Sequence, residues 1–152
     1  MKSLARLLHN IERLRWYVTK PITIGVRLIL VKDQTVLLVK HTYQRHWYLP
    51  GGGVRKSETL EEAARREAAE EFGGKLGRLC LFGVYTNLYE HKSDHVVVFS
   101  CDDFTLMGEK DYEIECCSFF RLDDLPSGVS PGSTRRIREY ASENDLPLVG
   151  VW

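Results

Sequence analysis

Three glutamates stand close together in a stretch of sequence that predicts a helix with one apolar face. At about 100° per residue, Glu67 and Glu71 fall on the apolar stripe and Glu70 falls at its edge. The other members of the stripe are Leu60, Ala63, Ala64 and Ala68. Carboxylates that face an interior repel one another and need a compensating cation, and Mg²⁺ prefers such hard oxygen ligands. The pattern therefore predicts a divalent-metal site, whereas a solvated acidic face describes Glu61 and Glu62 better.

A glycine-rich turn precedes this helix. Residues 49–53 read Leu-Pro-Gly-Gly-Gly, and glycine lets backbone amides or carbonyls meet a ligand directly. Residues 53–57 do not form a phosphate-binding P-loop, because that motif needs glycine immediately before Lys-Ser and Arg55 stands there. Taken alone, the turn indicates a close backbone approach and no particular ligand.

Composition and charge describe one ordinary globular domain. The chain has 152 residues, of which 43% are hydrophobic and 28% charged, with no apolar run near the roughly 18 residues of a membrane-spanning helix. The net charge is zero, but residues 1–57 carry eleven Lys or Arg and two acids, whereas residues 58–72 carry six Glu and two Arg. This division suits a polyanionic substrate bridged by a metal, although solvated surface charge would also produce it.

The chain start and the cysteines indicate a cytoplasmic protein. The basic N-terminus lacks the apolar core and cleavage site of a secretory signal. The four cysteines lack metal-site spacing, and two of them are adjacent, so we predict reduced packing residues. They are Cys80, Cys101, Cys116 and Cys117.

Periodicity predicts strands and helices in the order of an α/β or α+β fold with a mixed sheet. Residues 1–20 contain an amphipathic basic helix (3–18), which we expect to pack on its own domain or on a homodimer partner rather than on a membrane or nucleic acid. Residues 21–145 form a single domain. Its predicted strands are 23–31, 36–40, 47–49, 79–86, 95–101 and 116–121, and its predicted helices are 59–72 and 130–142.

The glutamate helix and its flanks resemble a known signature. Gly52, five residues, Glu58, seven residues and then Arg-Glu-Ala-Ala-Glu-Glu-Phe-Gly at 66–73 are similar to the Nudix box, found in hydrolases of nucleoside diphosphates linked to another moiety. Residues 49–52 and 119–126 also look like this family, so the resemblance extends over about 22–140. Gly74 departs from the pattern, which usually has an aliphatic residue there.

The resemblance implies a Nudix-type α/β/α sandwich and a role for each matching residue. Glu67, Glu70 and Glu71 would bind Mg²⁺, or Mn²⁺ as a substitute, together with the Gly51 carbonyl. Glu58 and Gly52 would support the site, and Arg66 would orient a glutamate through a charge-assisted hydrogen bond. Water, activated by the metal, would attack a pyrophosphate phosphorus.

The general base and the substrate contacts stay open in the sequence. Family members use either a box glutamate, here Glu67 or Glu70, or an acid from a later loop, for which Glu113 is our candidate and Glu115 a weaker one. Candidate substrate contacts are Arg27, Arg45, Trp47 and Arg55. Further aromatic residues could stack on a base or sugar or fill the core, namely Tyr43, Tyr48, Tyr85 and Tyr89. The histidines His41, His46, His91 and His95 lack a metal-ligand arrangement.

The sequence thus predicts a Mg²⁺-dependent hydrolase of a small nucleotide substrate. A Nudix-fold module that binds a nucleotide metabolite without hydrolysing it is the alternative, although a pure sensor has no need of a crowded carboxylate cluster. A stable nucleic-acid partner is not expected, because the chain is net neutral and has no second basic domain.

Overall fold

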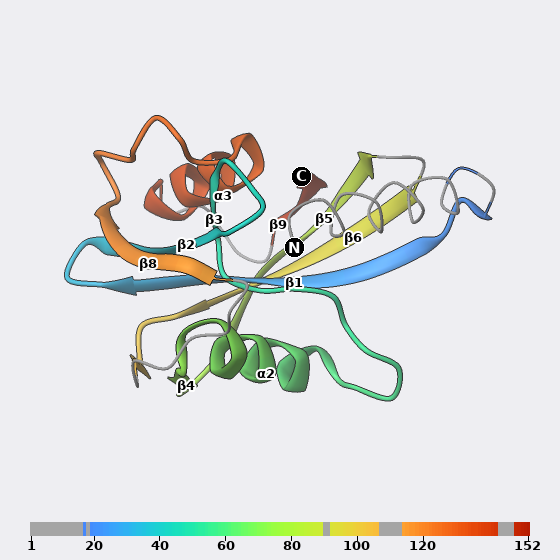
Figure 1. Cartoon of the computed structure of the whole chain (residues 1–152), viewed down its shortest axis with the longest axis horizontal. Coiled ribbons are helices and arrows are strands. Elements are labelled where there is room, and N and C mark those ends of the chain that lie inside the picture. Colours follow the sequence, from blue (N-terminus) through green and yellow to red (C-terminus); the bar gives the residue numbers. More distant parts are fainter. Residues whose placement is uncertain (1–16, 18, 90–91, 107–113, 143–147) are drawn as a thin grey trace.

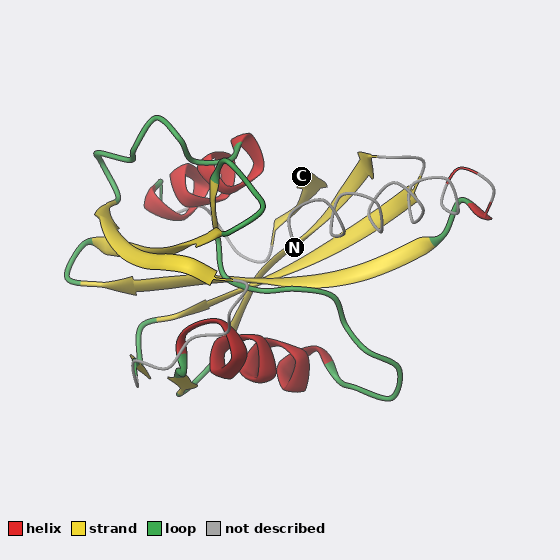
Figure 2. Ribbon diagram, viewed as in Figure 1, coloured by secondary structure: helices red, strands yellow, loops and turns green. Residues whose placement is uncertain are grey.

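The expected sandwich is confirmed: a mixed sheet lies between helix α2 (Leu60–Phe72) on one face and helix α3 (Pro131–Ala141) on the other (Figure 1). The computed structural model describes residues 17, 19–89, 92–106, 114–142 and 148–152. Figure 2 shows the long strands in the centre of the molecule, with helices α2 and α3 on opposite sides of them. The strands are β1 (Ile22–Lys32), β2 (Thr35–His41), β3 (Trp47–Tyr48), β4 (Lys75–Leu76), β5 (Cys80–Tyr89), β6 (Lys92–Cys101), β7 (Phe104–Thr105), β8 (Ile114–Arg121) and β9 (Leu148–Val151).

Strand β1 changes partners along its length. It pairs with β2 only next to their shared turn, at Val31↔Val36 and Lys32↔Thr35, and it runs parallel to β6 over the register 22–30. The strand order is β3-β2-β1-β6-β5-β9, and β8 lies antiparallel to β2. Because β2 separates from β1, the edge of β1 is free to pair with the glycine-rich turn. Val26 N donates to Gly52 O and Leu28 N to Pro50 O, both at 2.9 Å.

Alternate residues of β1 divide the core between the two faces, as the two-residue period of a strand requires. Val26, Leu28 and Leu30 pack towards α2, where Ala63, Ala64 and Ala68 are fully buried. Ile29 belongs to the second cluster, which contains Ile137 of α3. The apolar stripe predicted for residues 60–71 is therefore the face that α2 buries.

The predicted long elements are present, with bounds that differ by a few residues. The strands β4, β7 and β9 were not predicted, and β9 carries the main sheet past residue 145, the expected end of the domain, by pairing in parallel with β5. Most of the predicted N-terminal helix lies outside the described residues. Within the described part of the chain, no helix is long and apolar enough to cross a membrane. The four cysteines are free thiols; Cys101 is buried and Cys116 and Cys117 are half-buried, whereas Cys80 is exposed and is not the packing residue that was expected.

Candidate active site

Helix α2 is held at both ends by interactions that its sequence encodes. Thr59 caps the first turn: its side chain accepts from Glu62 N at 3.2 Å, and the Glu62 carboxylate accepts from Thr59 N at 2.8 Å. Gly73 ends the helix at φ 63°, a left-handed conformation that favours glycine. Gly74 also fits, because the Phe72 ring lies where a side chain at position 74 would stand. Both ends of α2 are therefore fixed, and so are the backbone positions of its glutamates.

Two glycines let the turn before α2 pass between β1 and the glutamates. Gly51 has φ 131°, and a Cβ there would lie 2.2 Å from the Val26 carbonyl oxygen. A Cβ at Gly52 would lie 2.4 Å from Glu67 Oε1. The absence of both side chains brings the backbone of the turn directly against a carboxylate of α2.

Arg66 joins three carboxylates to this turn. Its guanidinium makes a bidentate pair with Glu58, with Nε to Oε1 at 2.6 Å and Nη2 to Oε2 at 3.0 Å. Nη1 donates to Glu67 Oε1 at 2.6 Å and to Glu70 Oε2 at 3.1 Å, and Nη2 also donates to Gly53 O at 3.0 Å. The hydrogen bond from Arg66 is the main reason that the pKa of Glu58 falls to about 2. Arg66 thus neutralises part of the acidic cluster and fixes its orientation.

Glu71 is buried and receives no direct contact from Arg66. It is 5% exposed, and its Oε2 accepts a hydrogen bond from Gly51 N at 2.8 Å. Its Oε1 lies 3.7 Å from His41 Nε2. Burial raises the pKa of Glu71 to about 8, against the opposing charge of Arg27, and burial also lowers the pKa of His41. A carboxyl group with this pKa keeps its proton near neutral pH and would release it to solvent when a cation binds.

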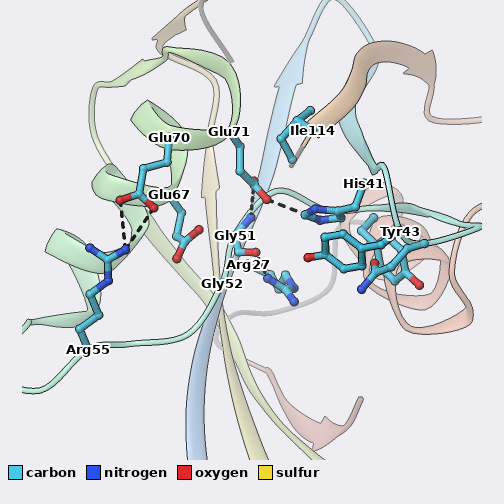
Figure 3. Close-up of a pocket in the computed structure, with 12 residues that line it drawn as sticks. Arg27, His41, Tyr43, Gly51, Gly52, Arg55, Glu67, Glu70, Glu71 and Ile114 are labelled. Carbon is cyan, nitrogen blue, oxygen red and sulfur yellow. Dashed lines mark hydrogen bonds and ion pairs between the residues drawn. The ribbon is translucent and has the colours of Figure 1, made fainter. Parts of the chain in front are cut away.

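These groups surround a pocket of about 370 Å³ that has two unlike walls (Figure 3). One wall is acidic and is formed by the α2 glutamates, with Arg55 hydrogen-bonded to Glu70 at 3.1 Å. His41 and Tyr43 stand on the opposite side, and the glycine turn with Arg27 lies between the walls (Figure 3). The complete lining is Arg27, His41, Tyr43, Gln44, Tyr48, Gly51, Gly52, Arg55, Glu67, Glu70, Glu71 and Ile114.

The acidic wall fits a hard divalent cation by the chemistry of its donors. Three carboxylates and the Gly51 backbone line one pocket, and oxygen is the ligand that Mg²⁺ and Mn²⁺ prefer. The donors are not gathered round a point: among the described residues, no three acidic, histidine or cysteine side chains converge closely enough to hold an ion. Glu67 and Glu70 are turned towards Arg66, and the Gly51 carbonyl accepts a hydrogen bond from Arg27. Ion binding would therefore require the carboxylates to turn into the pocket.

The remaining predicted residues divide between the pocket and other places. Arg27 and Arg55 line it, whereas Arg45 is exposed outside it. Trp47 belongs to the core instead, where its ring meets Phe120 edge to face at 4.9 Å. Glu113 lies outside the described residues. Glu115 is 52% exposed and its Oε2 is 3.7 Å from Lys40 Nζ.

Tyr43 and Tyr48, which were expected either to stack on a base or sugar or to fill the core, line the pocket. His41, Gln44 and Ile114 also line it, although no role in the site was predicted for them. Their place depends on how β2, β3 and β8 pair, which no local pattern encodes. The sequence offered one hint of this wall, a polar and aromatic segment between the predicted strands 36–40 and 47–49.

Comparison with protein families gives a match between residues 20–140 and the NUDIX domain model. A putative 8-oxo-dGTP diphosphatase of Bacillus subtilis (strain 168) is 43% identical over 113 residues, which are 74% of this chain and 75% of that protein. Diphosphoinositol polyphosphate phosphohydrolase 2 of Rattus norvegicus is 38% identical over 71 residues, which are 45% of this chain and only 38% of the rat protein.

Comparison with solved structures supports the same fold. A MutT NUDIX hydrolase from Burkholderia pseudomallei aligns with a TM-score of 0.70 at 27% identity. The alignment covers 77% of this chain and 96% of the other.

Proposed function

Because the chain belongs to the Nudix family, we propose that it hydrolyses a pyrophosphate bond in a nucleoside diphosphate linked to another moiety, or in a nucleoside triphosphate, with Mg²⁺ or Mn²⁺ as cofactor. The observation that carries the proposal is that Glu67, Glu70, Glu71 and Gly51 line one pocket together with two arginines. The enzyme class, a Nudix pyrophosphohydrolase, agrees with the diphosphatase and phosphohydrolase names of the relatives.

The acidic wall would hold the cofactor. Glu67, Glu70 and Glu71 would supply carboxylate oxygens, and Gly51 would supply its carbonyl oxygen. The bound ion would lower the pKa of a water molecule and draw charge from the phosphate oxygens. Glu71 would have to be ionised, so its proton must leave when the ion arrives.

The arginines of the site would have two different roles: one would position the glutamates, and the others would bind the substrate. Arg66 touches three glutamates and one backbone carbonyl, so it would act as a positioning residue, with Glu58 as its anchor. Arg27 and Arg55 line the pocket and would contact phosphate oxygens, for which a guanidinium is well suited. Glu67, Glu70 and Glu113 remain our candidates for the general base.

The deciding experiment incubates the protein with nucleotide sugars, dinucleotides and nucleoside triphosphates, with Mg²⁺ and with chelator, and measures by chromatography the nucleoside monophosphate and the phosphorylated partner or pyrophosphate that leaves with it. Turnover should require metal, and Glu71→Gln should reduce it by about 10³ or more. Glu61→Gln, on the exposed side of the same helix, is the matched control and should behave as wild type. Near-normal turnover by Glu71→Gln would contradict the metal assignment. Tight nucleotide binding without cleavage of any substrate would instead support the sensor.

The assembly and the location belong to the same proposal. We expect a cytoplasmic protein, in keeping with its free thiols, and a homodimer is the assembly to test by light scattering.

A further inference from the structure

The wall of the pocket that faces the glutamates is built from aromatic rings. Tyr43 is 54% exposed, and its ring centroid lies 5.4 Å from that of His41 at an interplanar angle of 37°. The ring of Tyr48 meets His41 edge-on at 6.1 Å. An exposed ring at the mouth of a pocket offers a face on which a flat ligand can stack.

The segment that carries this wall is anchored at both ends. His41 O accepts from Gln44 N at 3.2 Å, which closes a turn at the start of the segment. At the other end, Trp47 N donates to Gly128 O at 2.8 Å, and Ser130 N donates to Trp47 O at 2.9 Å. Tyr43 and Gln44 therefore stand on a supported loop.

Gln44 adds a polar group beside the rings. Its side chain lines the pocket, is exposed, and makes no hydrogen bond within the described part of the chain. An amide carries two donors and an acceptor, so it can pair with the edge of a nucleobase.

The charges of the pocket oppose a heavily phosphorylated ligand. Its described lining holds three glutamates against two arginines and contains no lysine. Arg27, which donates to Gly51 O, and Arg55, which donates to Glu70, are the two cations already assigned to the diphosphate. A polyol phosphorylated at many positions would need several further cations, whereas a neutral planar group needs only a ring face and hydrogen-bonding partners.

We propose that Tyr43, Gln44 and Tyr48 form the subsite for the nucleobase of the substrate, so that the enzyme selects nucleotides over polyphosphorylated polyols. This inference rests on the proposed function, because it names the part of the substrate that lies opposite the phosphates. Tyr43 supplies the stacking surface and Gln44 the polar contact. The glutamates and arginines keep the diphosphate on the other side of the pocket.

Equilibrium binding tests the subsite without requiring turnover. Calorimetry with AMP, GMP and the base-free probe ribose 5-phosphate is carried out in Mg²⁺. Tyr43→Leu should weaken AMP and GMP binding about tenfold and leave ribose 5-phosphate within about twofold, since stacking on a base is lost and no phosphate contact is. Tyr43→Phe, which keeps the ring, should stay close to wild type. Arg45→Leu, in the same segment but outside the pocket, is the control.

The outcomes separate this inference from the proposed function. Unchanged nucleotide binding by Tyr43→Leu, or equal binding of AMP and ribose 5-phosphate by wild type, would overturn the base subsite even in an active hydrolase. Faster cleavage of a diphosphoinositol polyphosphate than of any nucleotide would also overturn it. Tyr43-dependent nucleotide binding in a protein that cleaves nothing would keep the subsite and refute the hydrolase.

Discussion

Replacing Glu71 with glutamine should change how the metal-free protein responds to pH. Burial raises the pKa of Glu71 from 4.5 to about 8, so between about pH 5 and 8 the folded state keeps a proton that the unfolded state has lost. The free energy of unfolding of wild type should therefore fall as pH rises, by about 1.4 kcal/mol per pH unit from this group. Between pH 5.5 and 7.5 the loss is about 3 kcal/mol, a large part of the 5–15 kcal/mol typical of a domain.

Urea unfolding in chelator, followed by tryptophan fluorescence at pH 5.5, 6.5 and 7.5, measures this loss. Other groups titrate over the same range, so the informative quantity is the difference between wild type and Glu71→Gln at each pH. Glutamine keeps an oxygen that can accept from Gly51 N but cannot ionise, so the variant should become relatively more stable as pH rises. Glu61→Gln, which changes an exposed carboxylate on the same helix, should run parallel to wild type. Parallel curves for wild type and Glu71→Gln would refute the reasoning.

Metal binding should release into solution the proton that Glu71 holds in the metal-free protein. At pH 7, wild type should release close to one proton per Mg²⁺ bound, because Glu71 must ionise to become a ligand. Calorimetry in buffers of different ionisation enthalpy counts the protons. Release of the same number by Glu71→Gln would show that the proton comes from another group.

Three further substitutions probe the frame of the site. Gly52→Ala should place its Cβ against the Glu67 carboxylate and lower kcat about 10²-fold with folding retained, which steady-state kinetics and circular dichroism would show together. Arg66→Lys cannot reproduce the bidentate pair with Glu58 and should weaken Mg²⁺ affinity or activity about tenfold or more; wild-type Mg²⁺ affinity and kinetics would contradict the positioning role. Thr59→Ala should cost about 1 kcal/mol through loss of the helix cap, seen as a melting temperature about 2–4 °C lower with kcat unchanged.

The acidic half of the site could be predicted because its information is local. Thr59 and Gly73 mark the two ends of α2, and the helical period places Glu71 on the buried face. Arg66 was expected to orient a glutamate, and its guanidinium hydrogen-bonds to Glu58, Glu67, Glu70 and Gly53. The helical period could not predict, however, in which direction each carboxylate side chain points. Glu67 and Glu70 face Arg66, which depends on the turn that β1 holds in place.

The other half could not be predicted because distant strands position it. The two-residue strands β4 and β7 carry too short a pattern to detect, although they pair with each other. β9 is short, and it pairs with β5, which is far away in sequence. Trp47 was a candidate for the substrate, yet its ring packs on Phe120, because β8 lies beside β2. Only the sheet register brings Tyr43 opposite the glutamates.

The two walls of the pocket are held by largely different interactions, so substitutions in one wall can leave the other in place. The acidic wall depends on α2, the glycine turn and Arg66, whereas the aromatic wall depends on the turn at His41 and on the bonds between Trp47 and residues 128–130. Within the described part of the chain, the hydrogen bonds of Arg66 do not reach the aromatic segment. A substitution at Tyr43 can therefore alter which ligand is held while the carboxylates keep their arrangement. His41 connects the walls, because its Nε2 lies 3.7 Å from Glu71 Oε1 and its ring lies beside Tyr43, so substitutions there should change affinity for metal and for nucleotide together.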